Sequence, residues 1–231
     1  MYERIGFEGR RPSPFSWRIR YALGDPVKAG LVSSYGRPGG NITGISLLTT
    51  APESKRLGLL HDLVPKASVI GVLINPSYQE ADAQAHELEE GARTLSLRLR
   101  ILYAKNQEEL EVAFATFGQE RIDALLVSAD PFFDTKRDRI VAFAAQNRLP
   151  AIYQFREYAV AGGLMSYGIS LPEGYRWVGD YTARLLKGAK PSDLPIVQSI
   201  KFEFILNLKT AKALGIEVPP LLLARADEVI E

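Results

Sequence analysis

The chain has no cysteine, which excludes disulfide bonds, thiolate nucleophiles and cysteine metal ligands from all 231 residues. Histidine is also scarce: His61 and His86 are the two in the chain, and they lie far apart without clustered partners. Because a catalytic zinc ion needs about three protein ligands around an open position, the sequence predicts no metal site. No apolar run approaches the roughly 18 residues that a membrane-spanning helix requires.

An excess of charge of one sign is lacking as well. The 28 basic and 27 acidic residues leave a formal net charge of +1, and no long run of one sign occurs. The composition therefore does not favour nucleic acid or an anionic membrane surface as a partner. The hydrophobic content of 46% and the charged content of 24% are typical of a globular protein that holds one large domain or two small ones.

Sequence motifs of common catalytic sites are missing. The chain has no G-x-G-x-x-G, no G-x-S-x-G and no H-E-x-x-H. The glycine-rich segment Gly36–Gly40 lacks the Gly-Lys-Ser/Thr ending of a phosphate-binding loop and precedes a strand, so we predict a turn there. No nucleophile stands beside a base at a recognisable spacing. The sequence thus predicts a site that holds a ligand without reacting with it, and no cofactor.

What the middle of the chain does have is one repeated pattern, in which an apolar run ends in a short polar turn and an amphipathic helical stretch follows. Strands that are buried on both faces read as continuous apolar runs, and strands that alternate with helices indicate a parallel sheet. We therefore predict an α/β fold with a five-stranded, doubly wound parallel sheet. Its strands are expected at Val69–Ile74, Leu99–Tyr103, Ile122–Val127, Pro150–Tyr153 and Leu164–Tyr167.

The segment before this series has fewer predicted strands. Asp25 followed by Pro26 is typical of a helix start, which predicts a short helix over 27–35. A strand is expected at Ile42–Leu48 and a helix at Pro52–Val64. Because two strands do not make an independently stable layer, we interpret this part as the end of a second, similar lobe whose beginning is absent.

Two further elements are predicted after the series. Leu171–Lys187 has the apolar spacing of a long amphipathic helix, and Ile196–Leu206 is β-prone and is expected to be extended. Neither element adds a motif with catalytic chemistry.

Polar and aromatic residues gather where the predicted strands end. Ligands of open parallel sheets bind beyond the carboxyl ends of the strands, and helix starts favour anionic groups. The alternative is that such residues are ordinary helix caps, worth about 1 kcal/mol each. Asp130 suits a ligand ammonium, and Phe132 suits a ring or a cation. The predicted ligand-binding residues are Asn75, Asp130, Phe132, Gln154 and Tyr167 in one lobe, with Asp25 and Ser46 in the other.

Several segments of the chain, taken in order, resemble the ABC-transporter substrate-binding family related to tryptophan and tyrosine importers. The resemblance covers about residues 21–231 and is specific because seven motifs fall in sequence, with Leu223–Ile230 closing the match. The seven segments are Gly24–Val32, Arg37–Ser46, Lys55–Pro65, Ala129–Phe133, Leu149–Tyr153, Gly162–Gly168 and Asn207–Gly215.

This resemblance implies a type I periplasmic-binding-protein fold, with two α/β lobes joined by crossing strands. It implies a solute-binding component of an ABC importer, which captures a small organic solute, such as an amino acid, in an inter-lobe cleft and delivers it to a membrane permease. The expected lobes are 21–66 with 171–190, and 67–168 with 196–231, whereas residues 1–20 do not resemble the family and are expected to be unstructured.

The resemblance also implies a periplasmic location. The chain shows no signal peptide and lacks the early strand–helix units of the family's first lobe, so we expect an N-terminally truncated member. Under that expectation, a cytoplasmic location or a chain that no longer functions stands as the alternative to export.

Two other functions remain open from the residues alone. One is a flavodoxin-like or Rossmann-like α/β enzyme that uses Asp25 or Asp130 as a general base, for which turnover in a substrate screen would speak. The other is a sensory or regulatory domain of the same fold. A DNA-binding helix-turn-helix ahead of the fold would favour a repressor, and residues 1–20 are too short to supply one.

Overall fold

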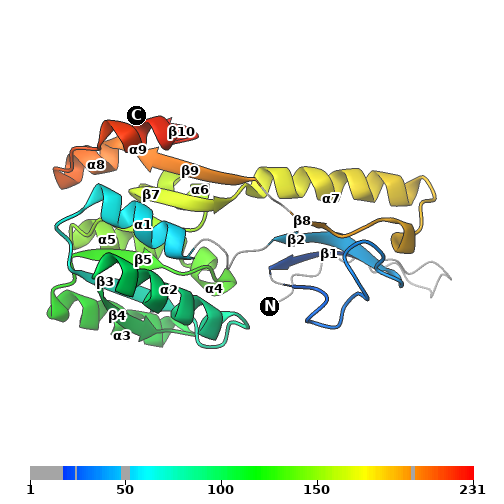
Figure 1. Ribbon diagram of the computed structural model, residues 1–231, viewed down its shortest axis with the longest axis horizontal. Helices are drawn as coiled ribbons and strands as arrows, with labels where there is room; N and C mark the ends of the chain where they lie inside the picture. The colour runs from blue at the N-terminus through cyan, green and yellow to red at the C-terminus, as the bar shows by residue number, and fades with distance from the viewer. Residues whose placement is uncertain (1–17, 24, 48–52, 199–200) are drawn as a thin grey trace. The chain divides into compact units, whose positions relative to one another are not determined.

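The computed structural model describes residues 18–23, 25–47, 53–198 and 201–231 (Figure 1). The chain divides into two compact units, and it passes from one to the other three times. The first unit comprises residues 1–49 and 169–201, and the second comprises residues 50–168 and 202–231.

The second unit is built on a seven-stranded sheet with the order β10-β9-β7-β6-β5-β3-β4. The strands β4, β3, β5, β6 and β7 pair in parallel, which confirms the predicted five-stranded parallel sheet. Two C-terminal strands extend it. The strands are β3 (Val69–Ile74), β4 (Arg98–Tyr103), β5 (Ala124–Val127), β6 (Ala151–Tyr153), β7 (Met165–Ile169), β9 (Phe202–Asn207) and β10 (Glu228–Ile230).

Helices cover both faces of this sheet because alternate residues of the buried strands point to opposite faces. On one face, Val72 of β3 joins a core with Leu60 of α1 (Glu53–Leu63) and Leu88 of α2 (Ala81–Leu95). On the other face, Gly71 leaves room for the ring of Phe117 of α3 (Gln107–Glu120). The other helices of this unit are α4 (Pro131–Thr135), α5 (Arg137–Gln146), α6 (Arg156–Val160), α8 (Leu208–Leu214) and α9 (Pro220–Arg225).

The first unit has a smaller sheet with the order β1-β2-β8. Its strands β1 (Arg18–Leu23), β2 (Ile42–Leu47) and β8 (Val197–Gln198) pair in parallel. The long helix α7 (Leu171–Leu186) packs Tyr181 and Leu185 against Leu194, which follows the 3-10 turn η1 (Pro191–Asp193). Three of its apolar or aromatic side chains are exposed: Tyr175 at 56%, Trp177 at 39% and Leu186 at 73% exposure.

The predicted helix over 27–35 is wrong. The chain makes one turn there, in which Ala29 N donates to Asp25 O and Gly30 N donates to Val27 O. Gly30 has φ +65°, a left-handed conformation that stops a helix. The Asp–Pro start signal was therefore real, but it introduces a turn and not a helix.

The two units differ from the predicted lobes at two segments. Helix α1 was expected in the first lobe, yet its leucines Leu57 and Leu60 lie in the core of the second unit's sheet. Residues 196–201 were expected in the second lobe, yet β8 pairs with β2 in the first unit. Of the segment 1–20 that was expected to be unstructured, residues 1–17 lie outside the described residues, and β1 begins at Arg18.

Gly168 in β7 allows a close backbone approach that a side chain would prevent. A Cβ atom at this position would lie 1.9 Å from the carbonyl oxygen of Gln154. We expect Gly168→Ala to lower the free energy of unfolding by about 1–3 kcal/mol, because a backbone carbonyl has little freedom to move away. Urea denaturation followed by far-ultraviolet circular dichroism measures the change.

Gly118→Ala is the matched control for this substitution. A Cβ atom there meets nothing closer than 3.8 Å, on an exposed turn of α3. It should raise stability by about 0.4–1 kcal/mol, since alanine favours the helix. Equal denaturation midpoints for the two variants would contradict the close approach.

Candidate functional site

The carboxyl ends of four neighbouring strands carry most of the predicted site. Asn75 directly follows β3, Asp130 follows β5 and Gln154 directly follows β6. Tyr167 is the middle residue of β7 and lies level with Gln154, because the preceding residues Tyr153 and Ser166 are paired. These strands are adjacent in the sheet and run parallel, so their carboxyl ends meet at one edge. Phe132 lies in α4, two residues after Asp130. The structure thus brings the five predicted residues of the second unit to one edge of one sheet.

A hydrogen bond joins two of these residues directly. Asn75 Nδ2 donates to Asp130 Oδ2 at 3.0 Å, and Asn75 Oδ1 accepts from Ser77 N at 2.9 Å. Asp130 Oδ1 accepts from Phe132 N at 2.9 Å and from Phe133 N at 3.1 Å, so Asp130 is the N-cap of α4. The capping role that the sequence left open is therefore real. A carboxylate has about four lone-pair sites, so this cap can still accept from a ligand.

Burial raises the pKa of Asp130, although the hydrogen bonds from Asn75, Phe133 and Phe132 act in the opposite direction. The side chain is almost completely buried, as are those of Asn75 and Gln154. A buried carboxylate gains from a nearby positive charge, because the charge restores part of the solvation that burial removed. The electrostatics at Asp130 therefore suit a cationic ligand group.

A second carboxylate lies behind the site. Gln154 Nε2 donates to Asp134 Oδ1 at 2.6 Å, and the Tyr158 hydroxyl donates to the same oxygen at 3.2 Å. Burial raises the pKa of Asp134 to about 7, and the charge of Asp130 adds to this effect. Sequence reasoning missed Asp134, because a charged residue in the first turn of a helix is normally a surface residue.

Phe132 and Tyr167 supply two aromatic surfaces, and both side chains are half-buried. The Lys136 Nζ atom lies 6.0 Å from the centroid of the Phe132 ring. Tyr167 stacks on Phe202, with ring centroids 5.7 Å apart and planes 16° apart. These rings are the members of the predicted set that keep substantial exposure on the second unit.

Asp25 and Ser46 belong to the first unit. Asp25 Oδ1 accepts from Val27 N at 2.8 Å and from Lys28 N at 3.2 Å. Burial raises the pKa of Asp25, but these hydrogen bonds outweigh it and leave the pKa below its ordinary value. Ser46 is buried in β2, in register with Gln198 of β8.

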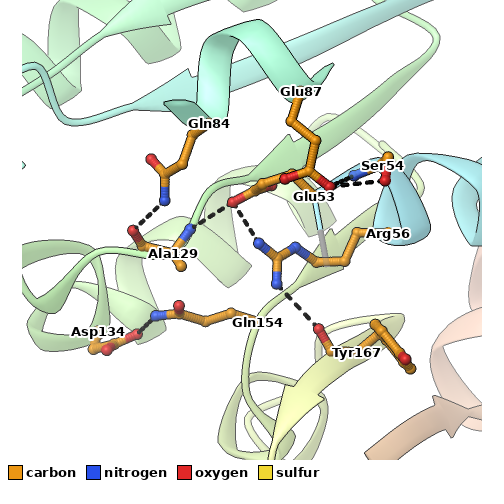
Figure 2. A network of polar contacts seen from close by, with 9 residues as sticks. All are labelled: Glu53, Ser54, Arg56, Gln84, Glu87, Ala129, Asp134, Gln154 and Tyr167. Carbon is orange, nitrogen blue, oxygen red and sulfur yellow. Dashed lines mark hydrogen bonds and ion pairs between the residues drawn. The ribbon is translucent and has the colours of Figure 1, made fainter. Parts of the chain in front are cut away.

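A buried polar network lies beside the strand ends and was not predicted (Figure 2). Glu53 and Arg56 of α1 form an ion pair with 0% and 1% of their side chains exposed. Glu53 Oε1 accepts from Ala129 N at 3.3 Å, and Arg56 Nη1 donates to the carbonyl oxygen of Tyr167 at 3.2 Å. Gln84 Nε2 of α2 donates to the carbonyl oxygen of Ala129 at 2.8 Å.

The sequence does contain a signal for this network. Glu53 lies four residues before Leu57, and Arg56 lies four residues before Leu60, so both charges occupy the apolar stripe of their helix. A charged residue at an apolar-stripe position is either buried with the stripe or marks the point where the buried face of the helix ends. Here both charged side chains are buried. Burial raises the pKa of Glu53 against the lowering effect of Arg56.

Three further observations concern cavities, metal ligands and membrane-spanning helices. A cavity of about 370 Å³ lies in the first unit and shares no residue with the predicted site; it is lined by Ser170, Glu173, Arg176, Trp177, Asp180 and Lys201. Among the described residues, no three His, Asp or Glu side chains gather as a metal ion would need. Within the same part of the chain, no helix has the length and apolar character to cross a membrane.

Solved structures of other proteins show which class of fold this chain has. An L-tryptophan complex of an ABC domain from Streptococcus pneumonia has a TM-score of 0.79 and 27% identity, over 92% of this chain and 71% of that one. A ligand-free, open substrate-binding protein with adhesive properties from Clostridium difficile has a TM-score of 0.61 and 27% identity, over 90% and 69%. The fold is thus that of the type I periplasmic binding proteins.

The family model for ABC transporter substrate binding proteins matches residues 19–230. The chain belongs to that family. The tyrosine-binding protein of Clostridioides difficile (strain R20291) is 30% identical over 200 residues, which are 86% of this chain and 57% of that protein. The chain therefore spans little more than half the length of this relative.

The raised pKa of Asp134 predicts a dependence of stability on pH. A carboxyl group whose pKa is raised by folding stabilises the fold below its unfolded pKa, and this contribution is lost as pH rises through the folded pKa. For Asp134 the window runs from the ordinary pKa of 3.8 to the raised pKa of about 7. We expect Asp134→Asn to reduce the loss of stability between about pH 5 and about pH 8 by on the order of 2–4 kcal/mol. Urea denaturation across this range measures it.

Asp123→Asn is the control for this prediction. Asp123 accepts hydrogen bonds from the backbone of Ser68 and Val69, which hold its pKa below the ordinary value. Its contribution is lost only as pH falls below the window, so the variant should lower stability without changing the slope between about pH 5 and about pH 8. If Asp134→Asn keeps the parent slope, Asp134 does not titrate there.

Proposed function

We propose that this chain is the solute-binding component of an ABC importer and that it captures an amino acid with an aromatic side chain. The observation that carries the proposal is the Asn75–Asp130 pair at the strand ends, flanked by Phe132 and Tyr167. Relatives that bind tyrosine and L-tryptophan support the choice of ligand.

In this proposal each group has a distinct role. The Asp130 carboxylate receives the ligand ammonium, since its pKa is raised by burial and a cation relieves that cost. Gln154 Oε1 is buried without a hydrogen-bond partner in the described part of the chain, so it offers an acceptor to a ligand N–H or O–H group. Phe132 and Tyr167 contact the ligand's ring, where aromatic pairs add about 0.5–1.5 kcal/mol beyond area burial.

Asp25 and Ser46 are the proposed contributions of the first unit. The proposed partner is a membrane permease, and the proposed location is the periplasm, as for the family. The proposal contains no chemistry on the solute. Closure around a ligand in proteins of this class is a hinge motion between lobes.

The alternative of an enzyme with Asp25 or Asp130 as general base is less well supported. Asp25 accepts two backbone hydrogen bonds that lower its pKa, which makes it a weaker base. Asp130 accepts three hydrogen bonds, from Asn75, Phe132 and Phe133. These hydrogen bonds favour the charged carboxylate and act against the effect of burial on the pKa of Asp130, and its remaining acceptor site is the one proposed here for the ligand ammonium.

Titration calorimetry with the 231-residue chain and a panel of amino acids tests the proposal. We expect L-tyrosine or L-tryptophan to bind. Asp130→Asn should weaken the affinity about tenfold or more, because a hydrogen bond to a charged group contributes about 1.5–3 kcal/mol. Asparagine can still cap α4, so the fold should survive. Tyr167→Ala should weaken binding of ring-bearing ligands more than that of L-alanine.

Two exposed residues provide controls that match these substitutions in chemistry. Asp138→Asn removes a carboxylate that is 85% exposed, and Tyr103→Ala removes an aromatic ring that is 52% exposed. Both should bind as the parent does. Absence of binding by the parent to every panel member, or unchanged binding by both site variants, would overturn the proposed function.

A further inference from the structure

Both backbone polar groups of Ala129, the N–H and the carbonyl oxygen, form hydrogen bonds with side chains. Its N–H donates to Glu53 Oε1 at 3.3 Å, and its carbonyl oxygen accepts from Gln84 Nε2 at 2.8 Å (Figure 2). Glu53 and Gln84 come from α1 and α2, so two helices fix one buried residue between β5 and α4. The next residue is Asp130. Fixing Ala129 therefore fixes the backbone from which the site carboxylate projects.

The same ion pair reaches a second strand end. Arg56 Nη1 donates to the carbonyl oxygen of Tyr167 at 3.2 Å. Tyr167 precedes Gly168, where the chain already lies against the carbonyl of Gln154. Glu53 and Arg56 thus connect the loop that carries Asp130 with the strand that carries Tyr167.

Stability alone does not account for this pair. Both side chains occupy the apolar stripe of α1 beside Leu57 and Leu60. Glu53 Oε2 and Arg56 Nε have no hydrogen-bond partner in the part of the chain that the structure describes. Buried ion pairs with incomplete hydrogen bonding are commonly no more stabilising than apolar side chains of the same size. The directed contacts to Ala129 and Tyr167 are what apolar side chains would not provide.

We propose that Glu53 and Arg56 are positioning residues of the solute site. Glu53 orients Asp130 through the Ala129 N–H, and Arg56 orients Tyr167 through its carbonyl oxygen. Neither residue is required to touch the solute. The affinity part of the proposal rests on the proposed function, whereas the structural part, the fixing of Ala129 and Tyr167, does not.

Two double variants separate positioning from charge. Glu53→Gln/Arg56→Met and Glu53→Leu/Arg56→Met both remove the ion pair, but the first keeps a carbonyl oxygen at position 53 that can accept from Ala129 N–H. We expect the leucine variant to bind L-tyrosine or L-tryptophan about tenfold more weakly than the glutamine variant, as the loss of one buried hydrogen bond implies. When Asp130→Asn is added to each, the difference should fall below about twofold, because Glu53 acts through Asp130.

A ligand-free measurement accompanies the calorimetry. The exchange rate of the Ala129 amide hydrogen, followed by NMR, should be about tenfold faster in the leucine variant than in the glutamine variant. The Asn75 side-chain amide signals, which report on Asp130 Oδ2, should shift in the leucine variant. In both variants the Tyr167 carbonyl signal should move, since both lack Arg56.

Leu88→Ala controls for loss of stability without loss of positioning. Leu88 is fully buried in the core formed by α1 and α2, so its truncation lowers the midpoint of unfolding. It should leave the Ala129 exchange protection and the Asn75 signals near those of the parent. It should also alter affinity by the same factor with Asp130 or with Asn at position 130.

The outcomes distinguish the two proposals. If the parent binds no amino acid, the proposed function fails, and the NMR comparison decides the positioning role on its own. If the leucine and glutamine variants show equal Ala129 exchange and equal Asn75 signals, the positioning role is overturned. The same conclusion follows if their difference in affinity persists unchanged in the Asp130→Asn background.

Discussion

Parallel strands that are buried on both faces must end at one edge of their sheet, and the second unit depends on this constraint. Its β3, β5, β6 and β7 are neighbours in the sheet, and each is followed by polar or aromatic residues at the same edge. Residues that are far apart in the sequence, such as Asn75 and Asp130, are therefore brought within hydrogen-bond distance without a dedicated loop. The helices that return the chain also bury the faces of the sheet.

That geometry has an energetic cost, because polar side chains at the strand ends, such as Asn75, Asp130 and Gln154, are buried. The molecule satisfies part of them internally: Asp130 caps α4, Gln154 donates to Asp134, and Gln84 donates to Ala129. Asp130 and Gln154, which shape this edge, are also residues proposed to contact the solute. The hydrogen bonds that are made hold these side chains in place, and a site whose groups are already held costs less to order when a ligand binds.

The alternation of strands and helices was predictable because each buried strand is a local apolar run in the sequence. The positions of the residues at the strand ends could be predicted from the same runs. The extent of the turn after Asp25 was not, since a helix start signal carries no information on length and Gly30 ends the turn. Nor could an apolar stripe say which sheet it covers, so α1 was assigned to the wrong lobe. The β-prone segment Ile196–Leu206 was predicted as one extended element, but it contains two strands, β8 and β9, which belong to different sheets. Glu53 and Arg56 were missed because charged side chains are rarely buried, and Asp134 because a charge in the first turn of a helix is normally a surface residue.

Trp177 on α7 has a consequence for how the two units can be observed. The chain contains two tryptophans: Trp177 belongs to the first unit, Trp17 lies outside the described residues, and the second unit contains none. Trp177 is 39% exposed and meets Tyr181 edge-on, so its emission is sensitive to the packing of α7. The emission of Trp177 therefore reports on the first unit, while circular dichroism is dominated by the larger second unit. The chain carries its own optical label for deciding whether the two units unfold together or one after the other.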